Sequence, residues 1–230
     1  MFEPTRARHK TVLAALRALD AAFLARCECF FGGGTRIVLA LGEYRESADM
    51  DFLCASRDGY RALRSAVTNA SLGRIATSRL KLAREVIADR YGIRTFLDIG
   101  GEKLKFEIIL EGRIGLAGAA MDGVPVRALD AQSCCAEKFL ANADRWSDES
   151  VLGRDAIDLA FMAARWERAA LHSGLATATA AYGKIVASAA KRAATRLLER
   201  ATWRRRCVAA LNVTDTRTLI SGLRLIAAGR

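Results

Sequence analysis

Two acids, Asp49 and Asp51, stand one residue apart where an apolar run, Met50 to Cys54, begins. The run predicts a strand, and the alternation of side chains along a strand places both carboxylates on one face. Two like charges on one face repel each other and are costly to bury without cations. Carboxylate oxygens are ligands that Mg²⁺ prefers, and a pair of such ions suits displacement at phosphorus. The alternative is a solvated edge strand whose acids bind nothing.

A glycine run, Gly32-Gly33-Gly34-Thr35, precedes these acids. We expect a short strand over Cys27 to Phe31, then the glycine turn, then a short helix through Leu41 with Thr35 as its N-cap. This order presents backbone N–H groups to an anion. Alone, the run fits a plain turn as well as a phosphate cradle. It is neither a P-loop nor a dinucleotide-binding motif, because no Gly-Lys-Ser/Thr follows and Ile37 stands where the second pattern needs glycine.

The remaining sequence predicts two differently built parts. Residues 10–25 and 58–70 have helical character, and Ile93 to Ile99 with Lys103 to Leu110 predict a hairpin. Pro125 is expected to close the strand-rich part, and the chain beyond Asp130 is alanine-rich and proline-free, which favours helix. We therefore expect an α+β fold. A mixed sheet flanked by helices would occupy residues 1–125, and an all-α domain over 126–230 would complete a nucleotide cleft.

Composition excludes several classes of protein. The chain has 230 residues, 52% of them hydrophobic, which is enough to build a core. The six cysteines lack paired CxxC spacing and are interpreted as reduced structural thiols rather than a zinc site. No stretch has the continuous apolar character of a membrane span, and the charged N-terminus lacks an apolar leader segment. We expect a cytoplasmic protein without a membrane partner.

The formal net charge of +11 is concentrated in residues 184–206, where Glu199 is the only acid. Spacing of four residues predicts a ridge of arginines along one helix. Such a ridge suits contact with the phosphate backbone of RNA, while a solvated basic face is the alternative. The candidate RNA-binding residues are Lys191, Arg192, Arg196, Arg200 and Arg204.

Further motifs extend the glycine and acid pattern along the chain. They are Arg45-x-Ser47, Ala136-Glu137-Lys138 and Arg154-Asp155-x-x-Asp158. In this order the pieces, over about residues 25–165, resemble the AbiEii/AbiGii toxin family. That family belongs to the DNA polymerase beta-like nucleotidyltransferase superfamily, and its relatives include the MenT toxins of mycobacteria. Arg36 and the additional Gly32 depart from the family's pattern, which bears on the choice of base.

The resemblance implies roles for the matched residues of the N-terminal part. The expected ligands of the catalytic Mg²⁺ ions, two in number, are Asp49 and Asp51. The residues expected to hold the nucleoside triphosphate are Gly33, Gly34 and Thr35, with Arg45 and Ser47 steadying the loop and the phosphates. Glu107 lies on a strand where the superfamily often places a third carboxylate, and it would bind metal or take a proton. An exposed strand glutamate is the alternative.

Three residues of the C-terminal part also have roles by resemblance. Lys138 would neutralise charge on the triphosphate, and Asp155 would complete the nucleotide site with Asp158 beside it. The two aspartates are three residues apart and share a helix face. For Lys138 the alternative is an ordinary surface lysine.

Together these residues predict an enzyme. It would transfer a nucleoside monophosphate from the triphosphate to an acceptor hydroxyl and release pyrophosphate. The basic residues favour RNA as the acceptor. The resemblance points to the 3′ end of tRNA and implies a toxin that a cognate antitoxin controls in a toxin–antitoxin or phage-defence system. The alternatives are a small-molecule, antibiotic-type nucleotidyltransferase and a non-catalytic nucleotide or nucleic-acid binding module.

Overall fold

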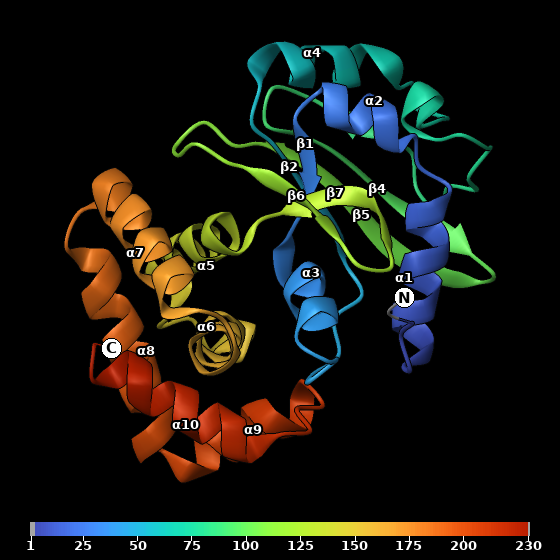
Figure 1. The fold of residues 1–230 in the computed structure, drawn as a ribbon. Coiled ribbons are helices and arrows are strands. Elements are labelled where there is room, and N and C mark those ends of the chain that lie inside the picture. Colours follow the sequence, from blue (N-terminus) through green and yellow to red (C-terminus); the bar gives the residue numbers. More distant parts are fainter. Residues whose placement is uncertain (1–2, 230) are drawn as a thin grey trace. The chain divides into compact units, whose positions relative to one another are not determined.

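A computed structural model describes residues 3–229, which form two compact units (Figure 1). The first unit contains the chain up to Ala40 together with Ser47–Asp130. The second contains Leu41–Glu46 and the chain from Ala131 onward. The fold is α+β, with a mixed sheet in the first unit and helices in the second, as the sequence predicts.

The sheet of the first unit has the order β3-β4-β5-β2-β1-β7-β6. Strand β2 pairs antiparallel with β1 and parallel with β5, so the sheet is mixed. Strands β4 and β5 form the predicted hairpin, which is visible as a long ribbon in Figure 1. The bounds are β1 (Cys29–Phe31), β2 (Met50–Cys54), β3 (Ile87–Ala88), β4 (Gly92–Ile99), β5 (Glu102–Leu110), β6 (Gly118–Met121) and β7 (Val124–Leu129).

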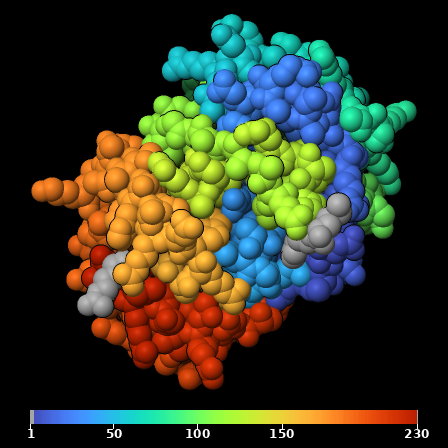
Figure 2. All heavy atoms as spheres, in the orientation of Figure 1, coloured from blue at the N-terminus to red at the C-terminus, as the bar shows by residue number. Residues whose placement is uncertain are grey.

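Pro125 does not close the strand-rich part, contrary to the expectation from sequence. It lies inside β7, which pairs with β6 and, through Ala128, with Phe31 of β1. The β6–β7 pairing shifts register between Ala119 and Met121. Because proline lacks an N–H group, such an irregularity is where a strand tolerates it. In Figure 2 the yellow-green atoms of this hairpin lie at the surface of the unit.

Four α-helices accompany the sheet among the described residues of the first unit: α1 (Ala7–Arg17), α2 (Ala21–Arg26), α3 (Gly33–Ala40) and α4 (Arg57–Ala66). The single helix expected over residues 10–25 is two helices. Asp20 separates them because its carboxylate accepts the N–H of Phe23 at 2.8 Å, while its own N–H donates to Ile75 O at 2.9 Å. Buried side chains of α1, α2 and the strands form the core of this unit.

The second unit is helical in its described part. Its α-helices are α5 (Ala131–Arg145), α6 (Arg154–Arg165), α7 (Arg168–Tyr182), α8 (Ile185–Glu199), α9 (Ala201–Ala210) and α10 (Thr216–Ala227). Small residues let these helices approach closely. A Cβ atom on Gly222 would lie 1.8 Å from the carbonyl oxygen of Ala160, and one on Gly174 would lie 2.4 Å from Cys135 Cβ. Alanines such as Ala190 and Ala194 are buried as well, so small side chains contribute to the packing between these helices.

Two expectations about the whole chain can be compared with the described residues. The six cysteines lie within the described residues, all are buried, and none of them is in a disulfide bond. None of the helices between residues 3 and 229 is long and apolar enough to cross a bilayer.

Candidate active site

The glycine turn, Gly32 to Gly34, packs directly against Asp51. Gly33 has φ of +66°, a conformation that glycine adopts without strain, and a Cβ atom at this position would stand 2.5 Å from Asp51 Oδ2. The preceding Gly32 donates its N–H to the carbonyl oxygen of Asp51 at 2.8 Å. Only glycine at position 33 therefore allows the turn and the carboxylate to meet, and the sequence-predicted neighbours are brought together.

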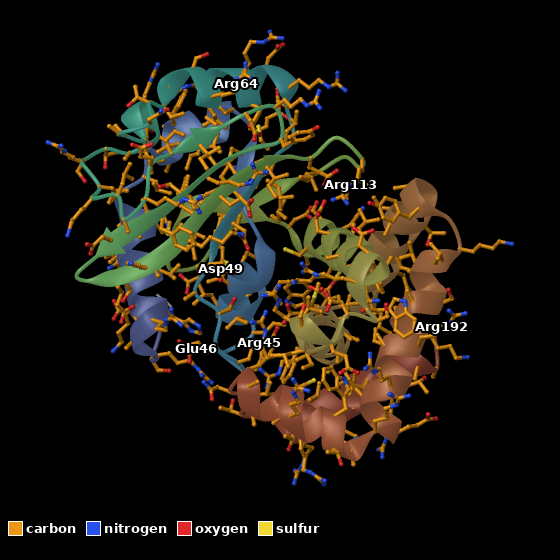
Figure 3. The ribbon with its side chains drawn as sticks, turned by 180° about the vertical axis from the view of Figure 1, so that it is seen from behind. Arg45, Glu46, Asp49, Arg64, Arg113 and Arg192 are labelled. Carbon is orange, nitrogen blue, oxygen red and sulfur yellow. The ribbon has the colours of Figure 1, made fainter. Side chains whose placement is uncertain are left out.

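Asp51 and Glu107 are direct partners in the register of the parallel pair β2–β5. Their side chains lie on the face of β5 opposite to the buried Phe106 and Ile108. Asp49 precedes β2 and is half-buried; Figure 3 labels it in the segment between α3 and β2. It contributes to the negative field that raises the pKa of Lys105, so it belongs to the same neighbourhood.

A lysine to which the sequence analysis gave no role lies between the carboxylates of Asp51 and Glu107. Lys105 Nζ forms an ion pair with Glu107 Oε2 and lies 3.6 Å from Asp51 Oδ1. On the other oxygen of Glu107, Arg94 Nε donates at 2.7 Å. Burial alone would raise the pKa of Glu107, but the Lys105 ammonium and the Arg94 guanidinium outweigh it and lower the pKa. Glu107 is thus held as a carboxylate.

The carboxylates of Asp51 and Glu107 are of the chemical type that binds a divalent metal ion. The Lys105 ammonium supplies the positive charge between Asp51 and Glu107 where a metal ion would lie. Carboxylate oxygens are the donors that Mg²⁺ prefers. As the side chains stand, no three His, Cys, Asp or Glu residues within 3–229 are grouped closely enough to hold a metal ion together. Binding an ion here therefore requires the side chains to rearrange around it.

Thr35 is not the N-cap of a helix, as the sequence suggested, but lies inside α3, which begins at Gly33. Its hydroxyl is buried and shares a hydrogen bond of 2.9 Å with Ser47 Oγ. The N–H of Ser47 in turn donates to Nε2 of the buried His9 at 3.2 Å. These contacts tie the segment before β2 to the helix that follows the glycine turn. No sequence pattern pointed to His9.

In the second unit, Asp158 is the centre of a buried ionic cluster. Arg45 Nε donates to Asp158 Oδ1 at 2.7 Å and Arg45 Nη2 to Oδ2 at 2.8 Å, a bidentate pair. Tyr44 donates its hydroxyl to Oδ1 at 2.6 Å. Arg45 is 1% exposed and Asp158 0%. Arg45 thus serves this cluster, and its expected contact with the phosphates stays a prediction.

Lys138 joins the two aspartates that the sequence placed on one helix face. Its Nζ lies 2.9 Å from Asp155 Oδ1 and 2.9 Å from Asp158 Oδ2. Lys138 is 7% exposed, so it is not an ordinary surface lysine. Arg145 adds a second bidentate pair, with Nε 2.6 Å from Asp155 Oδ2 and Nη2 3.0 Å from Oδ1. In this cluster three cations face two carboxylates.

The cluster strongly favours ionised carboxylates. Burial alone would raise the pKa of Asp158, but Arg45, Lys138 and the hydroxyl of Tyr44 outweigh it and lower the pKa to about 2. The same balance, with Lys138 and Arg145 as the cations, lowers the pKa of Asp155. Burial also raises the pKa of Tyr44, which keeps its hydroxyl a donor.

The segment Leu41–Glu46 joins this cluster because the connection between α9 and α10 holds its backbone. Tyr44 O accepts the N–H of Thr214 at 2.9 Å, and the N–H of Glu46 donates to Leu211 O at 3.0 Å. The ring of Tyr44 stacks on Phe161 of α6, with centroids 3.7 Å apart. A segment distant in sequence thereby delivers Arg45 to Asp158.

The expected arginine ridge is wrong as a single helix, since α8 ends at Glu199 and α9 begins at Ala201. Arg204 turns back and donates from Nη1 to Leu197 O and Leu198 O, both at 2.7 Å, which satisfies the end of α8. Arg196 is paired with Glu149. Lys191, Arg192 and Arg200 are exposed; Figure 3 labels Arg192 on α8.

Sequence reasoning missed Arg145 and Lys105, although each had a signal. Arg145 follows Lys138 by seven residues, two turns along one helix face, so both can reach the same partner. Lys105 precedes Glu107 by two residues and shares its strand face. For Tyr44 there was no comparable signal, because its partner Asp158 is 114 residues away.

Comparisons with known proteins give a matching family model and similar solved structures. The family model described as "Nucleotidyl transferase AbiEii toxin, Type IV TA system" matches residues 14–215. The crystal structure of JHP933 from Helicobacter pylori is similar over 100% of this chain and 94% of its own, with 19% identity and a TM-score of 0.57. A second H. pylori structure, described as a nucleotidyltransferase, covers 99% and 97%, with 19% identity and a TM-score of 0.56. None of the curated proteins compared with the chain is significantly similar.

Proposed function

The chain belongs to the AbiEii nucleotidyltransferase toxin family, and on this premise we propose that it transfers a nucleoside monophosphate from a nucleoside triphosphate to a hydroxyl group of RNA. We further propose that Mg²⁺ is required, that pyrophosphate is released, and that the acceptor is the 3′ end of tRNA. As a toxin it would be controlled by a cognate antitoxin. The small-molecule alternative has no specific support in the structure.

The contact of the glycine turn with Asp51 carries this proposal. Position 33 carries no side chain, and a Cβ atom there would stand 2.5 Å from Asp51 Oδ2, so the backbone of the turn and the carboxylate lie side by side. Backbone N–H groups of such a turn can bind a phosphate. Glu107 is next to Asp51 in register. A phosphate cradle and a carboxylate pair at one place are what phosphoryl chemistry needs, since its catalysis is mostly positioning and charge neutralisation.

The side chains would divide the work as follows. Asp51 and Glu107, with Asp49, would hold the divalent ions, which supply charge neutralisation at the phosphates when bound. Gly33 and Gly34 would place their backbone at the triphosphate, and the Thr35–Ser47 bond would steady that turn. Glu107 has a depressed pKa, so it is ionised at neutral pH and available as a ligand or proton acceptor.

The acceptor is tested by following the label. We expect protein incubated with each of the four α-³²P-labelled nucleoside triphosphates, Mg²⁺ and total RNA to place label on RNA of tRNA size, with one triphosphate preferred. Parallel reactions should contain protein alone and an aminoglycoside. Label confined to the protein or to the aminoglycoside would refute RNA as the acceptor. If tRNA whose 3′ terminus has been oxidised before the reaction no longer acquires label, the acceptor hydroxyl lies at that terminus.

The RNA contact is proposed for the exposed cations of the second unit, Lys191, Arg192 and Arg200. Unlike Arg196 and Arg204, they are not engaged by a carboxylate or by helix carbonyls in the recorded contacts. Exposed cations that face solvent release counterions when they contact phosphates, which gives binding a strong salt dependence. The salt dependence of binding is therefore the property that tests these three residues.

Reversing two of these charges should weaken RNA binding. We expect Arg192→Glu with Arg200→Glu to lower tRNA affinity by about tenfold at low salt and to reduce the slope of log affinity against log salt by about 1 per contact. The matched control reverses two exposed arginines of α10, Arg217 and Arg224. Filter binding across a salt series measures both. An unchanged slope, or an equal loss in the control, would contradict the assignment.

A further inference from the structure

The ammonium of Lys105 occupies the position between two carboxylates where a divalent ion would bind. It is paired with Glu107 Oε2 and lies 3.6 Å from Asp51 Oδ1, on the same strand face as Glu107. Its side chain is 38% exposed, so it has access to solvent and room to move. The long, flexible stem of lysine lets the ammonium leave without disturbing the strand.

Arg94 distinguishes this arrangement from an ordinary surface ion pair. It holds Glu107 Oε1 at 2.7 Å from the neighbouring strand β4, where it is the register partner of Glu107. Arg94 therefore still holds Glu107 Oε1 when Lys105 leaves, and the backbone of Asp51 is held by its contact with Gly32. The pair of carboxylates remains while its lysine cation is replaceable.

We propose that Lys105 is a built-in counter-cation that competes with divalent metal ions for the Asp51–Glu107 pair and so sets the metal affinity of the enzyme. The inference rests on the proposed function, because it treats this pair as the metal site. A divalent ion bound between Asp51 and Glu107 would repel the ammonium that lies there, so an ion that binds displaces it. Lys105 thereby raises the ion concentration that the site requires and stabilises the carboxylates when no ion is present.

Metal titration of the nucleotide-free protein tests this directly. We expect Lys105→Met, which keeps the apolar stem and removes the charge, to bind Mn²⁺ about tenfold more tightly than the unmodified protein in isothermal titration calorimetry. The matched control is Lys103→Met, which removes a positive charge from the same strand face at an exposed position outside the recorded contacts of the pair. Its affinity should stay within about twofold. Lys105→Arg should retain the weaker affinity of the unmodified protein.

Thermal unfolding gives a second readout that does not depend on turnover. In EDTA, Lys105→Met should melt at a lower temperature than Lys103→Met, because two adjacent carboxylates have lost a cation. Saturating Mn²⁺ should close that gap. Equal or weaker Mn²⁺ binding by Lys105→Met, tighter binding by the Lys103 control to the same degree, or no metal binding by any variant would each overturn the proposal. If the Lys105 effect is observed but no triphosphate donates its nucleotide, the proposed function fails and the inference stands.

Discussion

Replacing Asp51 with Asn should lower nucleotidyl transfer by at least about a thousandfold, because the change removes one carboxylate from the pair that would neutralise the phosphates. Asp51 is in register with Glu107 and in contact with the glycine turn, so its charge acts where the triphosphate would lie. Asn keeps the shape of the side chain and therefore its packing against Gly33. Incorporation of labelled nucleotide under saturating triphosphate measures the loss.

The fold of the Asp51→Asn protein should be retained. The side chain is 29% exposed, and its backbone contact with Gly32 does not involve the carboxylate. Circular dichroism and the melting temperature check this. Asp58→Asn, at an exposed position on α4, serves as the matched control and should keep full turnover. Turnover close to that of the unmodified enzyme in folded Asp51→Asn protein would remove this carboxylate pair from the reaction.

Replacing Asp158 with Asn should reduce the free energy of unfolding by about 3 to 5 kcal/mol, the loss typical when one partner of a buried ion pair is removed. Asp158 is 0% exposed and accepts hydrogen bonds from Arg45 and Tyr44 while pairing with Lys138. Neutral Asn leaves these cations with an excess of positive charge in the interior. Denaturation by urea, followed by circular dichroism, measures the change.

Two comparisons decide whether the loss comes from the buried cluster. Glu199→Gln, at an exposed position of α8, removes one negative charge from the same unit and should change stability by less than about 0.5 kcal/mol. A change for Asp158→Asn as small as this would show that the cluster contributes little.

The pH dependence of stability gives an independent check. The pKa of Asp158 is about 2 in the folded protein and about 4 in an unfolded chain, so its contribution is complete above about pH 4.

The sign of this effect follows from the lowered pKa. Below about pH 4 the Asp158 carboxylate binds a proton in the unfolded state but stays ionised in the folded state. The free energy of unfolding therefore falls as the pH drops toward about 2. The unmodified protein should lose stability steeply in that window. Asp158→Asn should start lower and lose less there, since it has no carboxylate to protonate.

The sequence pattern was sufficient to predict those parts of the fold that depend on residues close together in the chain. The apolar alternation of β2 and of the β4–β5 hairpin depends on side chains two residues apart, and these strands were predicted almost to the residue. The alanine-rich, proline-free C-terminal region is helical for equally local reasons. The errors occurred where a distant group intervened. Asp20 caps the start of α2 and is held by Ile75, which separates α2 from α1, and Arg204 donates to the last carbonyls of α8.

For the candidate site, the residue types and their order were readable from sequence, because Gly33, Asp51 and the later acids form a pattern that resembles a known family. What each side chain contacts was not. Lys138 looked like an isolated cation in an apolar helix, yet it is shared by Asp155 and Asp158. Arg45 lies four residues before Asp49 in sequence, but its guanidinium binds a carboxylate 113 residues away.

The amino-acid sequence by itself determined the α+β class, the family and the acidic strand beside a glycine turn, since each rests on residue order and short-range periodicity. Only the tertiary structure decided which charges meet. Register between β2 and β5 brings Glu107 to Asp51 and Lys105 between them, and packing of Leu41–Glu46 with the C-terminal helices brings Arg45 to Asp158. The physical reason is that Coulomb and hydrogen-bond energies depend on distance in space, which residues far apart in a chain acquire only on folding.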